Sequence, residues 1–562
     1  FRPISKDLQS ATLTIFSNDP TDPTVTLQLQ GIGQSAKPGG FVDIATNVGL
    51  GDTGAGFGVS WADYDNDNDV DLYLVRSTEP NRLYRNDSGT FTDIATALGI
   101  NDSGDGSAGI WGDVDRDGDL DLYLTNFGDA NRLYRNDNGT FTDVATTLGV
   151  NDPGDGYGAA WSDYDRDGDL DLYIANFGAN RFYQNDGNRF TDRTDSLGLG
   201  DTESGIQPAW GDIDNDGDPD LFLANSGPNR LFRNDGNTFT SIENLFSPTD
   251  AGPSFGAAWG DFDNDNDLDL FVPYFGANDR FYTNEGNGQF RDQALNLGLV
   301  NDGRGRGAVW GDFNNDGFLD LYMTNSGQPN AYYKNISQSG FRAFVELADS
   351  LGVALNADSR GIALSDFDND GGLDLYVAVQ NGSDAFYLNQ EANGNWLAIR
   401  PLGTESSIDA IGLRIEINYG NTRAIREISG GASFLSQDAL SAVFGVGDTE
   451  QIDLLTLRWA SGIVQQFDPL FDDLSTNRIL DITEQPPLPP ARVLAPAGTK
   501  NLLANGTSET GLTAQIVSTD NRLVPVSDRT VRFRIDSGEG IIIGGDSITV
   551  RDGIATARFR AG

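Results

Sequence analysis

Short alternating runs of hydrophobic and polar residues dominate most of the chain. Residues 72–75 read Leu-Tyr-Leu-Val and residues 89–93 read Gly-Thr-Phe-Thr-Asp, and Gly, Asn and Asp separate such runs. Aromatic and β-branched residues at a period of two, bounded by turn formers, indicate β-strands. The period of 3.6 residues that marks a helical solenoid is missing. The pattern therefore predicts an all-β protein of many short strands.

These strands are organised in a repeat. The segment from Trp61 to Tyr73 recurs, and the counterparts of Asp63 follow at steps of 50, 50, 49, 49, 51 and 54 residues. Each repeat predicts four strands: one ending in Trp-x-Asp, one after the Asp-rich loop, one at Asn-Arg-Leu-Tyr and one at Phe-Thr-Asp. Four strands in about 50 residues is typical of a propeller blade. The fold class we predict is a seven-bladed β-propeller with calcium-binding loops, plus β-sandwich (Ig-like) modules.

The ends of the repeat array indicate how the ring closes. The Phe-containing strand of each repeat is expected at Phe41, Phe91, Phe141, Phe190, Phe239, Phe290 and Phe341. The first of these precedes the first Asp-rich loop, and the seventh loop has none after it. We expect the N-terminal strand to complete the last blade, because a closed ring leaves no sheet edge open.

Each repeat carries a loop of the form D-x-D-x-D-[GN]-x-x-D. A Ca²⁺ ion binds six to eight oxygens at about 2.3–2.6 Å. Carboxylates at positions 1, 3 and 5 of a tight turn can surround one centre, position 7 can supply its backbone carbonyl, and position 9 can close the cage. Gly or Asn at position 6 permits a left-handed turn. Since the pattern recurs in every repeat, we predict about seven calcium sites.

The predicted metal ligands occupy the odd positions of the loops. They are Asp63, Asp65, Asp67, Asp69 and Asp71; Asp113, Asp115, Asp117, Asp119 and Asp121; Asp163, Asp165, Asp167, Asp169 and Asp171; Asp212, Asp214, Asp216, Asp218 and Asp220; Asp261, Asp263, Asp265, Asp267 and Asp269; Asp312, Asn314, Asp316, Phe318 and Asp320; and Asp366, Asp368, Asp370, Gly372 and Asp374. Loops six and seven depart from the pattern at Asn314, Phe318 and Gly372, so we expect these two sites to be weaker.

Composition narrows the function classes. The 562-residue chain has 84 acidic and 37 basic residues, a net charge of −47, which argues against nucleic acid and anionic membranes as partners. With no Cys and no His, disulfides, thiolate nucleophiles and imidazole bases are excluded. No apolar run of about 18 residues is visible, so no membrane insertion is expected. The chain opens on Phe1 without a visible signal peptide, as a processed or truncated end would.

Other segments differ from the repeats. We expect partial Ig-like strands in residues 1–35, the propeller in 41–390, a strand-rich domain in 391–484, a Pro-rich linker in 485–492 and an Ig-like module, possibly incomplete, in 493–562. Six Trp residues lie two positions before the first loop Asp: Trp61, Trp111, Trp161, Trp210, Trp259 and Trp310. Such residues can stack on sugars, but identical strand positions favour packing between blades.

The loops resemble the FG-GAP/VCBS repeats of integrin-α-like propellers, and this resemblance implies calcium binding. Residues 391–484, with Gly430-Gly431 and Phe444-Gly445-Val446-Gly447, are similar to the ASPIC/UnbV domain of cartilage acidic protein relatives. Residues 493–562 resemble invasin-type bacterial Ig-like modules, and residues 1–35 resemble ASPM/SPD-2/Hydin-type strands. These resemblances imply an extracellular or cell-surface protein, bacterial, with a role in adhesion.

Three functions stay open. The first is a calcium-rigidified structural or adhesive surface protein, a subunit of a head-to-tail homopolymer if the N-terminal strands complete the C-terminal module of the next copy. The second is a carbohydrate-binding propeller, and the third is a glycan-cleaving enzyme. We expect no enzymatic activity, since no acidic pair stands out beyond the metal loops. The partners we expect are a second copy of the chain, surface glycans or another surface protein.

Overall fold

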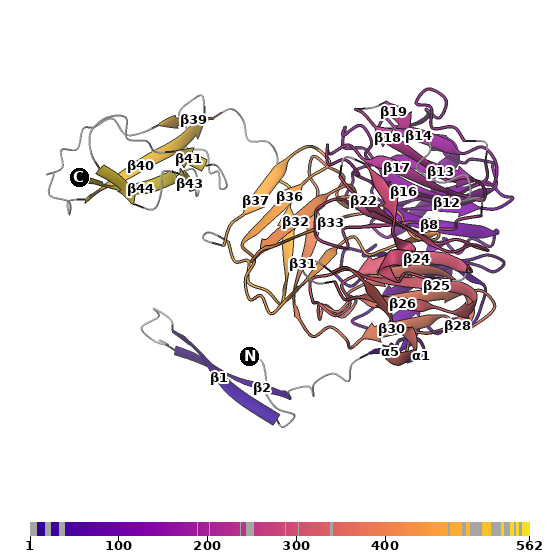
Figure 1. Ribbon diagram of the computed structural model, residues 1–562, viewed down its shortest axis with the longest axis horizontal. Helices are drawn as coiled ribbons and strands as arrows, with labels where there is room; N and C mark the ends of the chain where they lie inside the picture. Colours follow the sequence, from indigo (N-terminus) through magenta and orange to yellow (C-terminus); the bar gives the residue numbers. More distant parts are fainter. Residues whose placement is uncertain are drawn as a thin grey trace.

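The structure is a computed structural model. It describes residues 40–485 apart from 188, 202, 237, 243–251, 287, 302, 338–340 and 470–471, together with the backbone of strands nearer the two ends (Figure 1). Among the described residues we find no helix that is long and apolar enough to cross a lipid bilayer.

Seven four-stranded antiparallel sheets form within the described region, one for each predicted repeat, and pairing between strands joins the last two into one eight-stranded sheet. In chain order the first four are β4 (Gly56–Ala62), β5 (Asp71–Arg76), β6 (Arg82–Asn86) and β7 (Phe91–Asp93); β8 (Gly106–Gly112), β9 (Asp121–Asn126), β10 (Arg132–Asp137) and β11 (Thr140–Asp143); β12 (Gly156–Ser162), β13 (Asp171–Asn176), β14 (Arg181–Asn185) and β15 (Phe190–Asp192); and β16 (Gly205–Gly211), β17 (Asp220–Asn225), β18 (Arg230–Asn234) and β19 (Phe239–Ser241). The last three are β20 (Ala258–Gly260), β21 (Asp269–Val272), β22 (Arg280–Asn284) and β23 (Phe290–Asp292); β24 (Gly305–Gly311), β25 (Asp320–Pro329), β26 (Ala331–Asn335) and β27 (Phe344–Glu346); and β28 (Asn356–Ser365), β29 (Asp374–Val379), β30 (Ala385–Asn389) and β3 (Phe41–Asp43).

The sheets are arranged as a closed ring. The first strands of consecutive sheets contact one another from β4 through β8, β12, β16, β20, β24 and β28, and β28 returns to β4. The last sheet is completed by β3, which pairs Phe41 with Asn389 and Asp43 with Tyr387. The prediction that the N-terminal strand closes the ring is therefore confirmed, and the fold is propeller-like.

One predicted strand is wrong in position. Sheet six ends on β27, where Phe344 pairs with Asn335, and not on a strand at Phe341. Phe341 is 56% exposed, whereas Phe344 is buried in the core between sheets. The β26–β27 connection in this repeat is longer than in the others, so the Phe that fits the buried register lies three residues later.

The Trp residues that recur in successive repeats pack between sheets. The ring of Trp111 meets Tyr73 of the preceding sheet at a centroid distance of 6.1 Å, and Trp161 meets Tyr123 at 5.8 Å. Trp61, Trp111 and Trp161 are completely buried, and Leu364 fills the equivalent position of sheet seven. This packing supports the core interpretation over the sugar-stacking one at these positions.

Five four-residue helices follow outer strands in the described region: α1 (Ala45–Val48), α2 (Ala95–Leu98), α3 (Ala145–Leu148), α4 (Ala294–Leu297) and α5 (Ala348–Leu351). Each ends at a left-handed Gly such as Gly49, with φ of 97°. Nearer the chain ends, β1 (Leu8–Phe16) pairs with β2 (Thr24–Ile32). A separate sheet has the order β39 (Ala491–Leu494), β40 (Glu509–Ser518), β44 (Ile554–Ala561), β42 (Gly540–Ile543), and β41 (Thr530–Arg532) pairs with β43 (Ser547–Thr549). The side chains of these segments lie outside the described residues, and the Ig-like assignments stay predictions.

A second β domain covers one face of the ring (Figure 1). One sheet has the order β35 (Ala442–Gly447), β31 (Asn395–Leu402), β38 (Arg478–Thr483), and the other has the order β33 (Thr422–Glu427), β32 (Arg414–Tyr419), β36 (Leu454–Arg458), β37 (Val464–Phe467). Ile399, Ile415 and Leu457 belong to one buried core that the two sheets share.

Residues 429–439 leave this domain and enter the centre of the ring; we call this segment the plug loop. Its strand β34 (Ser436–Gln437) pairs in parallel with β4 of sheet one. The Gln437 side chain accepts a hydrogen bond from the Trp111 N–H at 2.7 Å and donates one to the Trp111 carbonyl at 3.0 Å, so it imitates a strand against sheet two.

The plug loop also bonds to the remaining five sheets. These hydrogen bonds are Trp161 N–H to the Gly430 carbonyl (3.0 Å), Leu435 N–H to Gln207 Oε1 (3.0 Å), Ser433 N–H to the Ala257 carbonyl (3.0 Å), Ala308 N–H to Ser433 Oγ (3.1 Å) and Leu364 N–H to Asp438 Oδ1 (2.7 Å). One loop is therefore bonded to the inner edge of every sheet. The Phe434 and Leu435 side chains at its tip are completely buried.

Candidate metal centre

The Asp-rich loops connect the first two strands of each sheet. In loop one, Asp63 at position 1 accepts hydrogen bonds from the N–H groups of Asp67 and Asn68, both at 2.9 Å. Asp71 at position 9 accepts from the Asn86 N–H at 2.7 Å and from the Tyr64 N–H at 3.2 Å. These carboxylates hold the turn closed and fix the positions of the remaining loop oxygens.

The backbone of the turn needs two left-handed residues. Position 6 has φ between 71° and 99° in every loop and is Gly or Asn, as predicted. Position 4 has φ between 57° and 62° in every loop and is Asn in five of them, with Arg116 and Arg166 in the other two. Asn adopts this conformation more readily than most residues. The second requirement was missed from the sequence.

Carboxylates of positions 1, 3 and 9 meet in the first four loops. In loop four, for example, oxygens of Asp212, Asp214 and Asp220 lie within 4.8 Å of one another. In loop five the group is Asp261, Asp263 and Asp265, at positions 1, 3 and 5. Position 7 carboxylates instead accept hydrogen bonds from outside the loop, as Asp69 does from the Ser88 N–H at 3.0 Å. The backbone carbonyl of position 7 is thus the group that we expect to face an ion.

Burial makes these clustered carboxylates costly when no cation neutralises them. Desolvation raises the pKa of Asp71, Asp121 and Asp220, all at position 9, to about 8. Desolvation also raises the pKa of Asp113, where the nearby Asp409 carboxylate adds to the effect, to about 7. At neutral pH these carboxyl groups must either be protonated or have a positively charged partner. Each of these loops therefore lacks positive charge near its buried carboxylates.

The donor set fits a hard cation. The Oδ1 atoms of Asp165, Asp214 and Asp263, all at position 3, are buried and have no hydrogen-bond partner among the described residues. A buried carboxylate oxygen without a donor is expensive, and coordination to a cation would satisfy it. The repeated acidic clusters are therefore suited to bind metal ions, with carboxylate ligands at positions 1, 3 and 9 in the loops where these groups converge.

Loop six is built differently, as its sequence suggested. Asn314 Nδ2 donates to Asp320 Oδ2 at 2.9 Å, and the Tyr332 hydroxyl donates to the same oxygen at 2.8 Å. These donors neutralise part of the need for a cation. In loop five, the Arg342 guanidinium forms an ion pair with Asp263 at position 3. Side-chain donors thus compete with a cation at these two loops, and also at loop three, where Gln184 Nε2 donates to Asp165 Oδ2 at 2.7 Å.

Position 4 side chains connect neighbouring loops around the ring; we call this series the loop belt. Asn66 Nδ2 donates to the Gly118 carbonyl (3.3 Å), Arg116 pairs with Asp169 (3.8 Å), Arg166 with Asp218 (2.8 Å), Asn215 donates to Asp267 (2.6 Å), Asn264 to the Gly317 carbonyl (2.9 Å) and Asn315 to the Gly371 carbonyl (2.9 Å). The second domain completes the series, because Arg400 donates to Asn369 of loop seven at 2.9 Å and to Asn68 of loop one at 3.4 Å. The loops are therefore linked to one another as well as to their own sheets.

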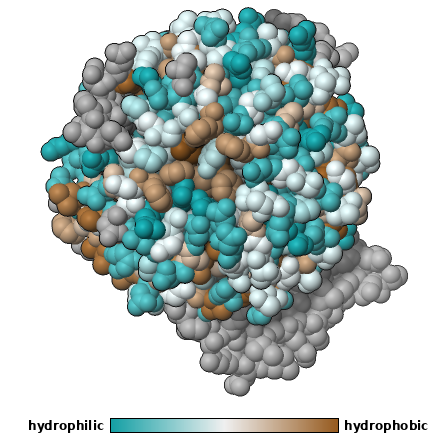
Figure 2. Space-filling model, turned by 90° about the vertical axis from the view of Figure 1, so that its right-hand side faces the viewer, coloured by the Kyte–Doolittle hydropathy of each residue, from teal (hydrophilic) through white to brown (hydrophobic). Residues whose placement is uncertain are grey.

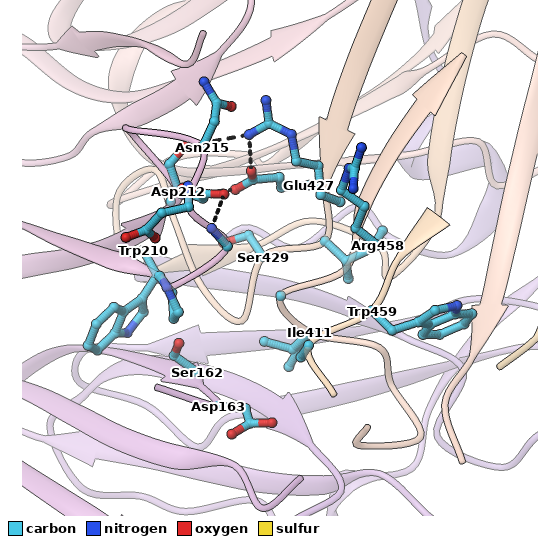
Figure 3. Close-up of a pocket in the computed structure, with 18 of the residues that line it drawn as sticks. Ser162, Asp163, Trp210, Asp212, Asn215, Ile411, Glu427, Ser429, Arg458 and Trp459 are labelled. Atoms are coloured by element: carbon cyan, nitrogen blue, oxygen red, sulfur yellow. Dashed lines mark hydrogen bonds and ion pairs between the residues drawn. The ribbon is translucent and has the colours of Figure 1, made fainter. Parts of the chain in front are cut away.

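A pocket of about 610 Å³ lies between the loop face and the second domain (Figure 3). Asp212 and Glu427 lie side by side in its lining, where the Asp212 N–H donates to Glu427 Oε2 at 3.4 Å. Arg414 joins them by donating to Glu427 Oε1 at 3.0 Å and to the Asp212 carbonyl at 3.5 Å. Arg458 and Trp459 contribute from the end of β36. The lining thus combines apolar and charged side chains, which is the usual character of a small-molecule pocket.

The fold and the loops together define a β-propeller of repeated acidic-loop blades with a second β domain on its loop face. The family profile described as "FG-GAP-like repeat" matches residues 63–124, 113–174, 163–223, 212–272 and 274–323, and the profile "ASPIC and UnbV" matches residues 403–487. The chain thus carries FG-GAP-like repeats and an ASPIC and UnbV domain, and it is related to cartilage acidic protein 1.

Cartilage acidic protein 1 of Xenopus tropicalis is 29% identical over 163 residues, which cover 28% of this chain and 24% of the relative. The mouse protein is 33% identical over 105 residues, covering 18% of this chain and 16% of the relative. The matches span about a quarter or less of these relatives. Among solved structures, a lectin of Agrocybe aegerita that recognises non-reducing terminal N-acetylglucosamine is 15% identical, with a TM-score of 0.37, covering 63% of this chain and 87% of that chain. The Swd1 β-propeller domain of Myceliophteria thermophila is 11% identical, with a TM-score of 0.36, covering 60% and 96%.

Proposed function

We propose that this protein is a calcium-binding structural and adhesive protein of the cell exterior, whose bound ions rigidify the loop face of the propeller. The observation that carries the proposal is the set of buried carboxylate clusters with unsatisfied position 3 oxygens. Several carboxylates and a backbone carbonyl at one centre suit Ca²⁺, which accepts six to eight oxygens, better than Mg²⁺, which keeps its waters.

The same geometry favours a structural role for the loops over a catalytic one. Asp71, Asp121 and Asp171 at position 9 are at most 1% exposed and already accept backbone hydrogen bonds. A substrate could not reach these carboxylates without opening the turn. The proposal therefore assigns them to metal binding and loop closure and assigns no enzymatic activity to the chain.

The test begins with metal-stripped protein. Equilibrium dialysis with metal analysis should give about seven Ca²⁺ per chain, and Ca²⁺ should raise the melting temperature well above its value in EGTA, since ligands that bind the native state stabilise it. An unchanged melting temperature in EGTA, or equal stabilisation by Mg²⁺, would contradict the calcium assignment. Adhesion is tested by the calcium-dependent binding of immobilised protein to cells, with labelling of intact source cells for the external location.

Carbohydrate binding is a second candidate, and the interdomain pocket favours it. Trp459 and the exposed Arg458 line this pocket, and the Arg458 side chain makes no hydrogen bond to another described residue. A glycan array in calcium buffer should then give ligands that Arg458→Ala weakens. An array without ligands would leave the structural role alone.

The head-to-tail filament is a finer form of the first proposal. It concerns residues 1–33 and 493–562, whose side chains lie outside the described residues. If it is right, the full-length chain forms filaments in calcium and a chain without residues 1–33 stays folded and monomeric. A full-length chain that is monomeric at high concentration would refute it.

A further inference from the structure

The mouth of the central channel opposite the second domain is lined by one side chain from each sheet. Each of these residues stands six positions before the first Asp of its loop, near the start of an inner strand: Phe57, Ser107, Tyr157, Ile206, Phe255, Arg306 and Arg360. Since the loops lie at the other end of these strands, this ring of residues lies at the uncovered end. Figure 2 shows hydrophobic residues gathered near the centre of that face.

The aromatic members converge on the plug loop. The Phe434 ring at the tip of the plug lies 5.8 Å from the ring of Phe57 and 5.7 Å from that of Phe255. The rings of Phe57 and Tyr157 lie 6.1 Å apart. The plug therefore closes the channel from the side of the second domain, and the rings of Phe57, Tyr157 and Phe255 surround its tip.

Two adjacent sheets place arginines beside these aromatic rings. The Arg306 Cζ atom lies 3.8 Å from the centroid of Phe255 and 4.8 Å from that of Phe275, and the Arg360 Cζ atom lies 5.6 Å from that of Phe57. Arg360 has an ion pair with Asp358 at 2.8 Å. Arg306 has no hydrogen bond or ion pair with any described residue, although it is only 8% exposed, and its Nε is a buried donor without a partner.

This arrangement is electrostatically incomplete. Burial, and then the positive charge of Arg360, lower the pKa of Arg306 to about 10. A guanidinium has five N–H donors, and aromatic faces attract its charge without accepting those hydrogen bonds in full. A buried charge without an ionic partner destabilises a fold. An anion that binds from solvent would pair with the guanidinium and offset the free-energy cost of its desolvation.

We propose that the channel mouth is a binding site for a small organic carboxylate, held by Arg306 with Arg360 beside it. A carboxylate matches the guanidinium fork and can accept two parallel N–H bonds. The aromatic walls at Phe57, Tyr157 and Phe255 would cover the apolar body of the ligand. The site lies at the opposite end of the inner strands from the metal loops and does not depend on the function proposed above.

The experiment titrates the calcium-loaded full chain by calorimetry with two probes, sodium benzoate and sodium glucuronate. The Arg306→Met variant keeps much of the side-chain volume but removes the guanidinium. The Arg304→Met variant is the matched control, because Arg304 carries the same charge two residues earlier on the same segment and is exposed. The Arg306→Met change removes the charged donor of the proposed hydrogen bonds, so we expect it to weaken binding at least tenfold and Arg304→Met to leave binding within about twofold.

Thermal unfolding separates ligand binding from a purely structural cation–π contact. We expect Arg306→Met to melt at or above the wild-type temperature without probe and to lose the stabilisation that benzoate gives the wild type. Binding of benzoate alone marks an aromatic acid as the ligand class, and binding of glucuronate alone marks a sugar acid. The proposal fails if the wild type binds neither probe, if Arg306→Met binds as tightly as the wild type, or if this variant is destabilised in probe-free buffer.

Discussion

The substitution Asp214→Asn should change stability in opposite directions with and without calcium. Asp214 is at position 3 of loop four, and its Oδ1 is buried without a partner among the described residues. One of its oxygens lies within 4.8 Å of one oxygen each of Asp212 and Asp220. The amide has the same shape and no charge. In metal-free protein the change removes a repelling charge, whereas in calcium it removes a ligand.

The magnitude follows from Coulomb's law. Two unit charges about 5 Å apart repel by about 3 kcal/mol at an effective dielectric constant of about 20. Burial raises the pKa of Asp212 to about 7 and that of Asp220 to about 8, so both are partly protonated at neutral pH and the repulsion is reduced. We therefore expect a stabilisation of about 1–2 kcal/mol without metal, which is a rise of roughly 1–3 °C in melting temperature for a cooperative unit of about 350 residues.

The assay is thermal unfolding of the wild type and the variant in EGTA and in excess CaCl₂. In calcium, Asp214→Asn should melt below the wild type, because coordination to a charged ligand is lost. Asp218→Asn is the control in the same loop: its carboxylate pairs with Arg166 at 2.8 Å, and we expect a small decrease in both buffers. If Asp214→Asn shifts the melting temperature in the same direction in both buffers, the inference that its unsatisfied oxygen faces an ion is refuted.

Three further predictions concern pH, loop six and the plug. Burial raises the folded-state pKa of Asp71, Asp121 and Asp220 to about 8 from an ordinary value of 3.8. The metal-free folded state therefore holds more protons than the unfolded state, and its stability falls as pH rises from about 4 to 8. The melting temperature of metal-stripped protein should be higher at pH 5.5 than at pH 8, and the reverse order would contradict the burial argument. Asn314→Asp should increase the calcium affinity of loop six in calorimetric titrations and lower the melting temperature of the metal-free protein. An unchanged binding isotherm would count against the account of loop six. Gln437→Ala leaves the buried N–H and carbonyl of Trp111 without partners and should cost about 2–4 kcal/mol in unfolding experiments, while Gln466→Ala on the exposed surface should cost under about 0.5 kcal/mol; equal effects would argue against the plug contacts.

The periodic part of the fold could be predicted because each repeat restates the same local chemistry. Gly118 and its counterparts adopt the left-handed conformation that position 6 requires, and counting strands against loops predicts that the strand at Phe41 completes the last sheet. Register failed where the repeat changes length: Phe341 and Phe344 both match a strand pattern, and the choice depends on which side chain reaches the core, a tertiary property.

Features that depend on contact between distant segments left no periodic signal. Asn66 and Arg116 stand at position 4, a place that the ligand pattern treats as free, yet they reach the next loop. No pattern in the sequence of residues 429–439 predicts hydrogen bonds to every sheet. Arg306 and Arg360 occupy equivalent positions in neighbouring repeats, but only the structure shows that both lie against aromatic rings at the centre of the propeller.

The plug loop has a consequence for the order in which the molecule is made. Residues 429–439 follow the last sheet in the chain, so the ribosome releases all seven sheets before the segment that bonds to each of their inner edges. Until then water fills the central channel of the nascent propeller, and the backbone groups of the inner strands that bond to the plug loop have no protein partner. Arrival of the plug pairs those groups in one event, which couples sheets that would otherwise unfold with their neighbours alone. The last quarter of the chain thereby decides when the first three quarters become a single cooperative unit.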